Sequence, residues 1–159
     1  MRLHLTAVLV ATLLVPTTAS TQSWSPAERE IIDLNQGCWD AWASHELPRI
    51  AATCNEHPDA RSWWTPNAAP DKGWYATNVR RFMDAVGSKE VWIYWEINPI
   101  SVRIFNGTAL IHFWATQTVR GIDGEVKTTS QKQLNIWQRI DGRWTFIGGM
   151  AVPDPDSGR

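Results

Sequence analysis

Several patterns that mark common protein classes are missing from this chain of 159 residues. Its basic residues form no run and its formal net charge is −1, so nucleic acid is not an expected partner. We find no Gly-x-Ser-x-Gly element, no phosphate-cradling glycine loop and no dinucleotide fingerprint. No histidine pair has ligand spacing and no Cys-x-x-Cys motif occurs. We therefore predict neither a metal site nor a cofactor.

The N-terminal stretch has the pattern of a secretory signal peptide over residues 1–20. It carries one arginine, an apolar run from Leu5 to Val15, and small residues up to Ala19. The apolar run is too short for a transmembrane helix. We expect cleavage near Ser20, a secreted or periplasmic mature chain, and no membrane contact after the signal is removed. A retained membrane anchor is the alternative.

Cysteine is scarce, with only Cys38 and Cys54 present. The two residues fall on successive predicted helices joined by a short turn. In an exported protein they either form a disulfide or remain two small buried thiols. A disulfide would contribute about 3 kcal/mol in the chain-entropy description.

Three helices are predicted in the first half of the chain. Ser25, Pro26 and Glu28 supply an N-cap, a first-turn proline and the third helical position of a capping box. This first helix extends to about residue 44, and its stripe at helical spacing consists of Ile31, Leu34, Asn35, Cys38, Trp39 and Trp42. The other two helices are expected over 47–54 and 74–86. The segment 57–67, with a proline near each end, suits a short edge strand.

The second half reads as four long strands, over about 90–105, 108–120, 125–140 and 143–152. The pairs Asn106-Gly107, Asp123-Gly124 and Asp141-Gly142 supply the positive φ angles that tight hairpins require. Pro99 inside the first strand predicts a bulge. Residues 21–152 form one domain in this interpretation, and residues 153–159 form a disordered tail.

Both faces of the predicted sheet carry apolar side chains. On strand 108–120, Leu110, His112 and Trp114 alternate with Ile111 and Phe113. We therefore expect helices and a pocket on one side of the sheet. The outer side would meet a second copy in a homodimer.

The order of elements resembles the NTF2-like superfamily, in particular its SnoaL-like and DUF4440-type members. HPDARSWWTP is similar to the family's segment after helix two, and NIWQRIDGRWTFIGG to its closing hairpin. The resemblance covers about residues 25–152. It implies an α+β cone in which three N-terminal helices pack on a strongly curved antiparallel sheet. The family includes lyases, isomerases, polyketide cyclases and non-catalytic binding proteins, so the fold does not choose the function.

The acidic groups of the family's steroid-isomerase branch are replaced here. Its base aspartate falls on Thr65, its helix-one tyrosine near Cys38 or Trp39, and its neutral aspartic acid near Asn135. A histidine that often ends the last strand of SnoaL-like chains is also lost. Steroid-type isomerisation is therefore disfavoured.

Two candidate catalytic residues remain. His112 is an acid or base in the useful range, if it is not a core histidine or one that points outward. Asn135 could hold a carbonyl oxygen with Gln131 and Asn35, if these amides do not simply bridge structural elements. Glu96 is a further acid or base if the Pro99 bend turns it inward, and is otherwise solvated.

Eleven tryptophans favour an aromatic cavity, although many of them would serve only as core. The candidates to line it are Trp39, Trp42, Trp63 or Trp64, Trp114 and Trp137, with Tyr75 at its mouth. Two functions are consistent with such a cavity. One is a cofactor-free lyase, isomerase or polyketide-cyclase-like enzyme, and the other is a non-catalytic module that binds a small, largely apolar or aromatic molecule.

Overall fold

The computed structural model describes residues 22–63, 71–72 and 90–154. The proposed signal peptide, the third predicted helix at 74–86 and the last residues of the tail lie outside this part of the chain. Within it, the elements are α1 (Pro26–Ala43), α2 (Leu47–Cys54), β1 (Glu56–Trp63), β2 (Asp71–Lys72), β3 (Glu90–Phe105), β4 (Thr108–Gly121), β5 (Val126–Ile140) and β6 (Arg143–Pro153).

Helix α1 begins at the predicted capping box. The Ser25 hydroxyl accepts from the Glu28 backbone N–H at 3.3 Å, and the Glu28 carboxylate accepts from the Ser25 N–H at 2.8 Å. The backbone hydrogen bond from Ser25, followed by that from its side chain, holds the pKa of Glu28 below its ordinary value. The buried face of the helix is Ile31, Asn35, Cys38, Trp39, Ala41 and Trp42.

Helix α2 is tied to both of its neighbours. A disulfide joins Cys38 of α1 to Cys54, the last residue of α2, with an S–S distance of 2.05 Å. The helix ends at Asn55 in a left-handed conformation with φ of 41°. The Asn55 side chain then donates to the Trp144 carbonyl oxygen at 2.8 Å and to Thr145 Oγ1 at 3.0 Å. The turn after α2 is therefore anchored on β6.

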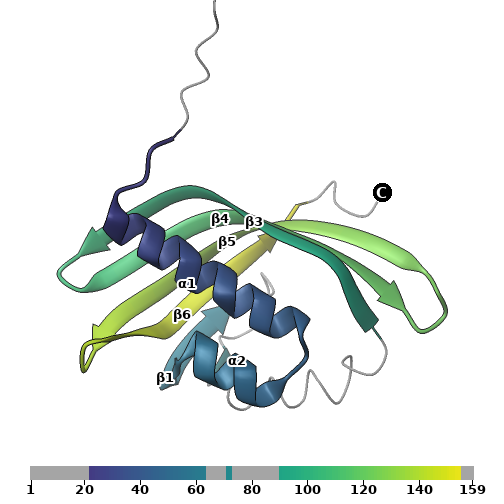
Figure 1. Ribbon diagram of the computed structural model, residues 1–159, viewed down its shortest axis with the longest axis horizontal. Coiled ribbons are helices and arrows are strands. Elements are labelled where there is room, and N and C mark those ends of the chain that lie inside the picture. Colours follow the sequence, from purple (N-terminus) through teal and green to yellow (C-terminus); the bar gives the residue numbers. More distant parts are fainter. Residues whose placement is uncertain (1–21, 64–70, 73–89, 155–159) are drawn as a thin grey trace, which may run out of the picture.

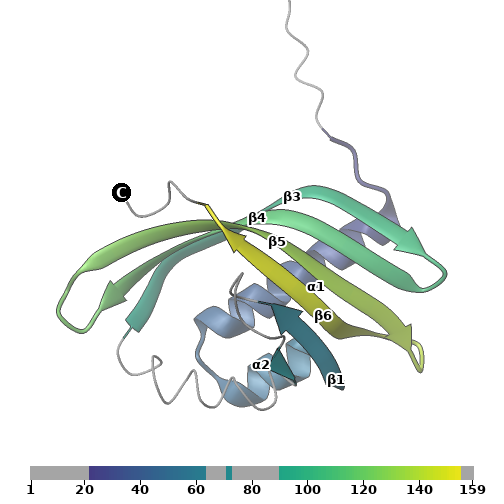
Figure 2. The same cartoon turned by 180° about the vertical axis from the view of Figure 1, so that it is seen from behind.

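Six strands form one sheet in the order β2-β1-β6-β5-β4-β3. The four long strands are antiparallel, as predicted, whereas β1 pairs in parallel with β6. Strand β1 was predicted to lie at the edge, and this is wrong, because the short β2 pairs along its free side through Arg61–Lys72 and Ser62–Asp71. Seen from behind, β1 lies beside β6 (Figure 2).

The hairpin turns follow the predicted dipeptides. Asn106 and Gly107 have φ of 46° and 79°, and Asp141 and Gly142 have φ of 49° and 78°, the positive values that two-residue turns need. The connection from β4 to β5 is longer than the other two. In it the Asp123 carboxylate accepts from the Glu125 N–H at 3.0 Å.

Pro99 marks a bulge, as the sequence predicts. The register between β3 and β4 shifts between Pro99 and Ser101, and again between Trp92 and Tyr94. These shifts lie in the long, bent β3 that forms one border of the sheet (Figure 1). Proline fits there because it has no N–H for a ladder hydrogen bond.

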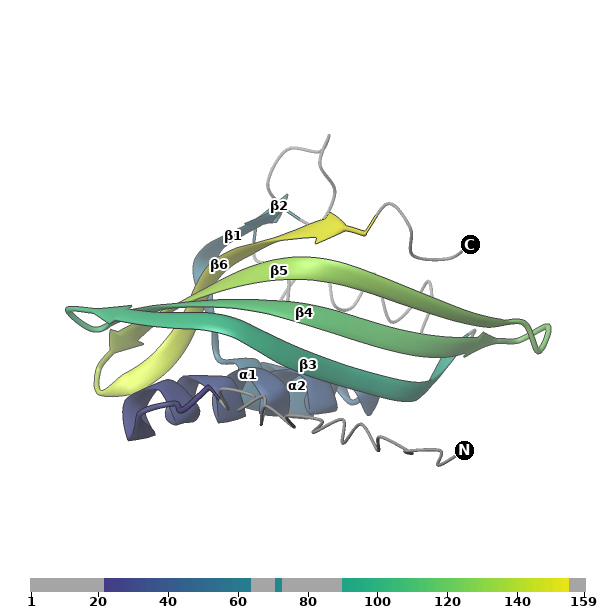
Figure 3. The same cartoon turned by 90° about the horizontal axis from the view of Figure 1, so that it is seen from above.

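Helices α1 and α2 lie on one side of the sheet, against its concave surface (Figures 1 and 3). We call this side of the sheet the inner face and the opposite side the outer face. The architecture is thus α+β, with helices packed on a strongly curved sheet. No helix in the described part of the chain combines the length and apolar character that crossing a membrane requires.

Candidate functional site

A pair of buried amides joins α1 to the middle of the sheet. Asn135 Nδ2 on β5 donates to Asn35 Oδ1 on α1 at 2.7 Å, across 100 positions of sequence. The two residues are 1% and 0% exposed. The amide on the apolar stripe of α1, the predicted binding residue Asn35, therefore meets the predicted catalytic residue Asn135 of β5.

Each amide of this pair keeps an unused hydrogen-bonding group. Asn135 Oδ1 and Asn35 Nδ2 are both buried and have no hydrogen-bond partner. Exchanging O and N in both amides would preserve their mutual bond and would again leave one acceptor and one donor. Buried polar groups are usually satisfied, so a buried pair that uses only half of its capacity points to a missing partner.

Trp137 adds a second unused donor. It lies two residues along β5 from Asn135 and hence on the same face, and its side chain is fully buried. Its Nε1–H has no hydrogen-bond partner. Its ring packs edge-on against Phe146 of β6 at a centroid distance of 5.5 Å.

Gly149 keeps the strand next to Asn135 free of a side chain. It is the partner of Asn135 in the β5–β6 ladder. A Cβ at this position would lie 2.8 Å from Asn135 Oδ1 and 2.9 Å from the Leu134 carbonyl oxygen. Sequence reasoning noted the loss of a histidine near this glycine but assigned no role to it. Which residue of β5 lies opposite this glycine depends on the pairing of the strands, which the structure supplies.

Aromatic side chains surround the inner face. The Trp39 ring of α1 lies 5.6 Å from the Trp92 ring and 6.4 Å from the Phe113 ring, between centroids. Trp42 is also buried. The predicted tryptophans of α1 therefore lie on the side of the amide pair.

Two glutamines share the inner face with Asn135. The register pairs Gln131 with Ala115 and Gln133 with Phe113, both on the inner side of β4. Gln133 is only 4% exposed. Alternation along β5 already placed it beside Asn135, and its omission from the predicted site is an error of selection.

Asp40 is a carboxylate on the sheet-facing part of α1 whose bonding is accounted for. Its Oδ1 accepts from Trp95 Nε1 of β3 and from Gln36 Nε2, both at 2.8 Å. The bond from Trp95 fixes α1 against β3, and the bond from Gln36 lies within α1. The part of the chain that the structure describes contains no group of three or more His, Cys, Asp or Glu able to hold a metal.

His112 does not join this site, and the prediction that it works beside Asn135 is wrong. Ile111 is the β4 residue opposite Asn135, whereas His112 pairs with Leu134. Neighbouring residues of a strand point to opposite faces, so His112 lies on the outer face, where it is exposed. Sequence alone could not choose the face, because both faces of this strand are apolar.

Trp114 shares the outer face with His112. It is partly exposed, and the Lys132 Nζ lies 4.9 Å from its ring centroid. The prediction that Trp114 lines the cavity on the inner face is therefore wrong. Among the other predicted aromatics, Trp63 ends β1, where its backbone pairs with Met150. Tyr75 lies outside the described residues.

Glu96 also belongs to the outer face, since its partner in β4 is Thr116. A hydrogen bond with Glu96 raises the pKa of the nearby Tyr94 above its ordinary value. The bend at Pro99 therefore does not bring this carboxylate to Asn135.

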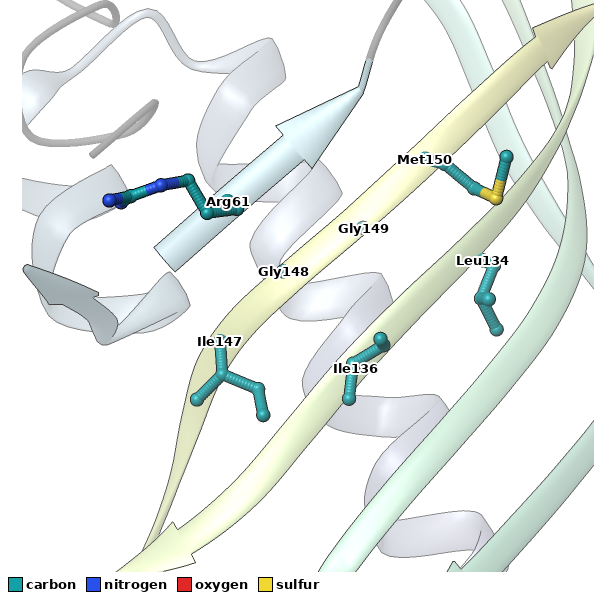
Figure 4. A pocket seen from close by; sticks show the side chains of 7 residues that line it. All are labelled: Arg61, Leu134, Ile136, Ile147, Gly148, Gly149 and Met150. Atoms are coloured by element: carbon teal, nitrogen blue, oxygen red, sulfur yellow. The ribbon is translucent and has the colours of Figure 1, made fainter. Parts of the chain in front are cut away.

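A hollow of about 180 Å³ lies over β5 and β6 (Figure 4). The register places Leu134, Ile136 and Met150 on the outer face, so this hollow opens on the side away from the amide pair. The Arg61 side chain extends away from these apolar groups. The hollow is lined by Arg61, Leu134, Ile136, Ile147, Gly148, Gly149 and Met150.

No protein-family model matches this chain, and no curated protein matches it either. Several solved structures, however, are similar to it. An NTF2-like protein from Cytophaga hutchinsonii aligns with a TM-score of 0.64 at 14% identity, over 79% of this chain and 97% of that one. A ketosteroid isomerase-like protein from Erwinia carotovora atroseptica gives 0.65 at 12% identity, over 82% and 98%.

A third similar structure is the CaMKII hub of S. rosetta, with a TM-score of 0.63 at 17% identity, over 84% of this chain and 100% of that one. These three proteins share one architecture but have different descriptions. At such identities the likeness concerns the path of the backbone rather than any shared site. The chain therefore has the NTF2-like fold.

Proposed function

We propose that this protein binds a small, largely apolar or aromatic molecule between α1 and the inner face of the sheet. The observation that carries the proposal is the half-used amide pair, in which Asn135 Oδ1 and Asn35 Nδ2 are buried without partners. A ligand that satisfies these groups would recover the free energy that their burial costs. Trp39 and Trp137 supply apolar surface on the same side.

The composition of the inner face favours an apolar ligand. Among the described residues, the buried polar ones are Asn35, Gln133, Asn135 and Thr145, and the rest of the buried set is apolar. Binding sites for small molecules commonly combine an apolar lining with a few polar groups that fix orientation. The amide pair would provide that orientation.

We favour binding without chemistry over a cofactor-free lyase, isomerase or cyclase. An enzyme of that kind needs a proton carrier beside the bound ligand. His112 and Glu96 are on the outer face, and Asp40 is occupied by two donors. The described inner face therefore offers orienting amides but no acid or base next to them.

Ligand capture tests the proposal directly. We expect native mass spectrometry of the exported protein to show a copurified small molecule, and aromatic ketones to quench its tryptophan fluorescence. Asn135→Leu should weaken this binding, whereas His112→Ala on the other face serves as the matched control. Absence of any ligand together with absence of quenching by such compounds would contradict the proposal.

We also propose that the outer face pairs with a second copy of the chain. Leu134, Ile136 and the exposed Met150 form an apolar strip there, and a charge of each sign, Lys132 and Glu96, accompanies it. A self-complementary twofold contact needs both signs on one patch. Sedimentation velocity should show a dimer that Leu134→Glu dissociates and Gln138→Glu, at the end of the same strand, does not. A wild-type monomer at all concentrations would refute this.

Export remains part of the proposal. The disulfide between Cys38 and Cys54 supports an oxidising compartment. Cell fractionation of the full-length chain, with N-terminal sequencing of the product, should find it outside the cytoplasm and shortened near Ser20. Retention of the complete chain in the cytoplasm would contradict export.

A further inference from the structure

We propose that the ligand of the amide pair is an uncharged molecule that presents a hydrogen-bond donor and acceptor side by side, as a lactam or carboxamide does. This inference rests on the proposed binding function and names the chemical class that the site selects. It follows from the free groups of the site and from the absence of buried charge among the described residues.

The free groups of the site demand both hydrogen-bonding roles at once. Asn135 Oδ1 needs a donor, while Asn35 Nδ2 and Trp137 Nε1 need an acceptor. A carbonyl oxygen has two lone pairs and can accept twice, and an adjacent N–H can donate once. A ligand that only accepts leaves Asn135 Oδ1 unpaired, and one that only donates leaves both donors unpaired. Each unpaired buried group lowers affinity by about tenfold or more.

One small group can serve both amides. The free acceptor and the free donor belong to carboxamides that are themselves joined by a single hydrogen bond of 2.7 Å. Only the length of these two planar groups separates the free atoms. A ligand amide edge carries the complementary pattern of one donor and one acceptor.

The site selects against charged ligands. The buried polar residues of the described chain are all uncharged, so an ionised carboxylate would lose its hydration without gaining a cation. The ion pair between Arg139 and Glu30 is about half exposed on both sides and remains in solvent. The neutral amides can instead form hydrogen bonds with a neutral ligand without the burial of a charge.

Gly149 contributes by what it lacks. A Cβ there would approach Asn135 Oδ1 to 2.8 Å, closer than real Cβ atoms come to their neighbours. Glycine therefore lets Asn135 Oδ1 pack directly against the backbone of β6, which fixes the orientation of this carboxamide.

Three compounds that share a fused two-ring body test the inference by calorimetric titration: 2-quinolinone, N-methyl-2-quinolinone and naphthalene-2-carboxylate, with the corresponding one-ring series as a size control. We expect 2-quinolinone to bind at least tenfold more tightly than its N-methyl derivative, which cannot donate. The carboxylate should bind most weakly. In Asn135→Leu the preference for the lactam should fall to about twofold or less, whereas His112→Ala should retain it.

The outcomes separate the two proposals. Equal affinity for the lactam and its N-methyl derivative, or tighter binding of the carboxylate, overturns the ligand class while leaving ligand binding intact. Failure of every member of both series to bind contradicts the ligand class and the proposed function together. The comparison is made on the wild-type protein, so it holds even where Asn135→Leu folds poorly.

Discussion

The two faces of the β4–β5 pair are built from alternate residues of the same strands, and yet they differ in almost every physical respect. On the inner face, Ala109, Phe113 and Trp137 are fully buried. On the outer face, His112 and Lys132 are exposed. Apolar content does not separate the two, because the outer face also has Leu110 and Trp114. In the part of the chain that the structure describes, α1 and α2 lie on one side of the sheet only, and this cover decides which residues become core and which remain available for contact.

The largest expected effect comes from truncating the inner tryptophan. Trp137→Ala removes a fully buried ring that packs on Phe146, and we expect a loss of about 3–5 kcal/mol in the free energy of unfolding. Trp114→Ala is the matched change on the outer face. It removes a partly exposed ring and a contact with Lys132, and should cost about 1 kcal/mol. Urea denaturation of both variants measures the difference, and equal losses would refute the assignment of the faces.

Removal of the disulfide should have the second largest effect, because this bond joins the two helices that cover the inner face. Cys38 lies one turn beyond Asn35 on α1, and its bond to Cys54 holds α1 to α2. Replacing both cysteines with serine should lower the free energy of unfolding by about 3 kcal/mol, as expected for closing a loop of this length. We also expect weaker ligand binding, because Asn35 would be less firmly placed.

Reduction of the wild-type protein is the matching control for this change. Its denaturation midpoint should move to that of the double serine variant, whereas the variant itself should not respond to reductant. A midpoint that is indifferent to reductant in the wild type would show that the bond contributes nothing to stability.

The amide pair should behave as one unit that joins the two layers. Asn135→Leu or Asn35→Leu leaves a buried partner unmatched and should cost about 1–3 kcal/mol. Replacing both with leucine removes the mismatch, so the double variant should be more stable than the sum of the single losses predicts. A double-mutant cycle from urea denaturation measures this coupling. Strict additivity would mean that the two side chains do not interact.

The local structure of this chain was readable from its sequence because each signal is short-range. The capping box at Ser25 and Glu28 and the turns at Asn106-Gly107 and Asp141-Gly142 each specify the backbone within a few residues. Pro99 likewise predicted the bulge in β3 from a single residue. The parallel pairing of β1 with β6 was missed, because it joins residues about 90 positions apart and no local pattern encodes it.

The site was only half readable for a related reason. Asn35 was identified as the polar residue on an apolar helical stripe, and Asn135 by its place in a resembling family, and the two meet. His112 was assigned to the wrong face, because a two-residue period gives the faces but not which of them is covered. The close packing of Asn135 Oδ1 against Gly149 depends on pairing between strands, which only the three-dimensional structure supplies.

The smallest expected effect comes from comparing two neighbouring residues of β4, one on each face of the sheet. His112→Ala changes an exposed outer residue, so we expect a change within about 0.5 kcal/mol in the free energy of unfolding and no loss of ligand affinity. Ile111→Ala, one position earlier, shortens a fully buried side chain on the inner face opposite Asn135. It should lower the free energy of unfolding by about 2–5 kcal/mol. Denaturation at a protein concentration low enough to keep the chain monomeric, followed by ligand titration, measures both variants. A destabilisation by His112→Ala that matches Ile111→Ala would mean that α1 does not cover the face to which it has been assigned.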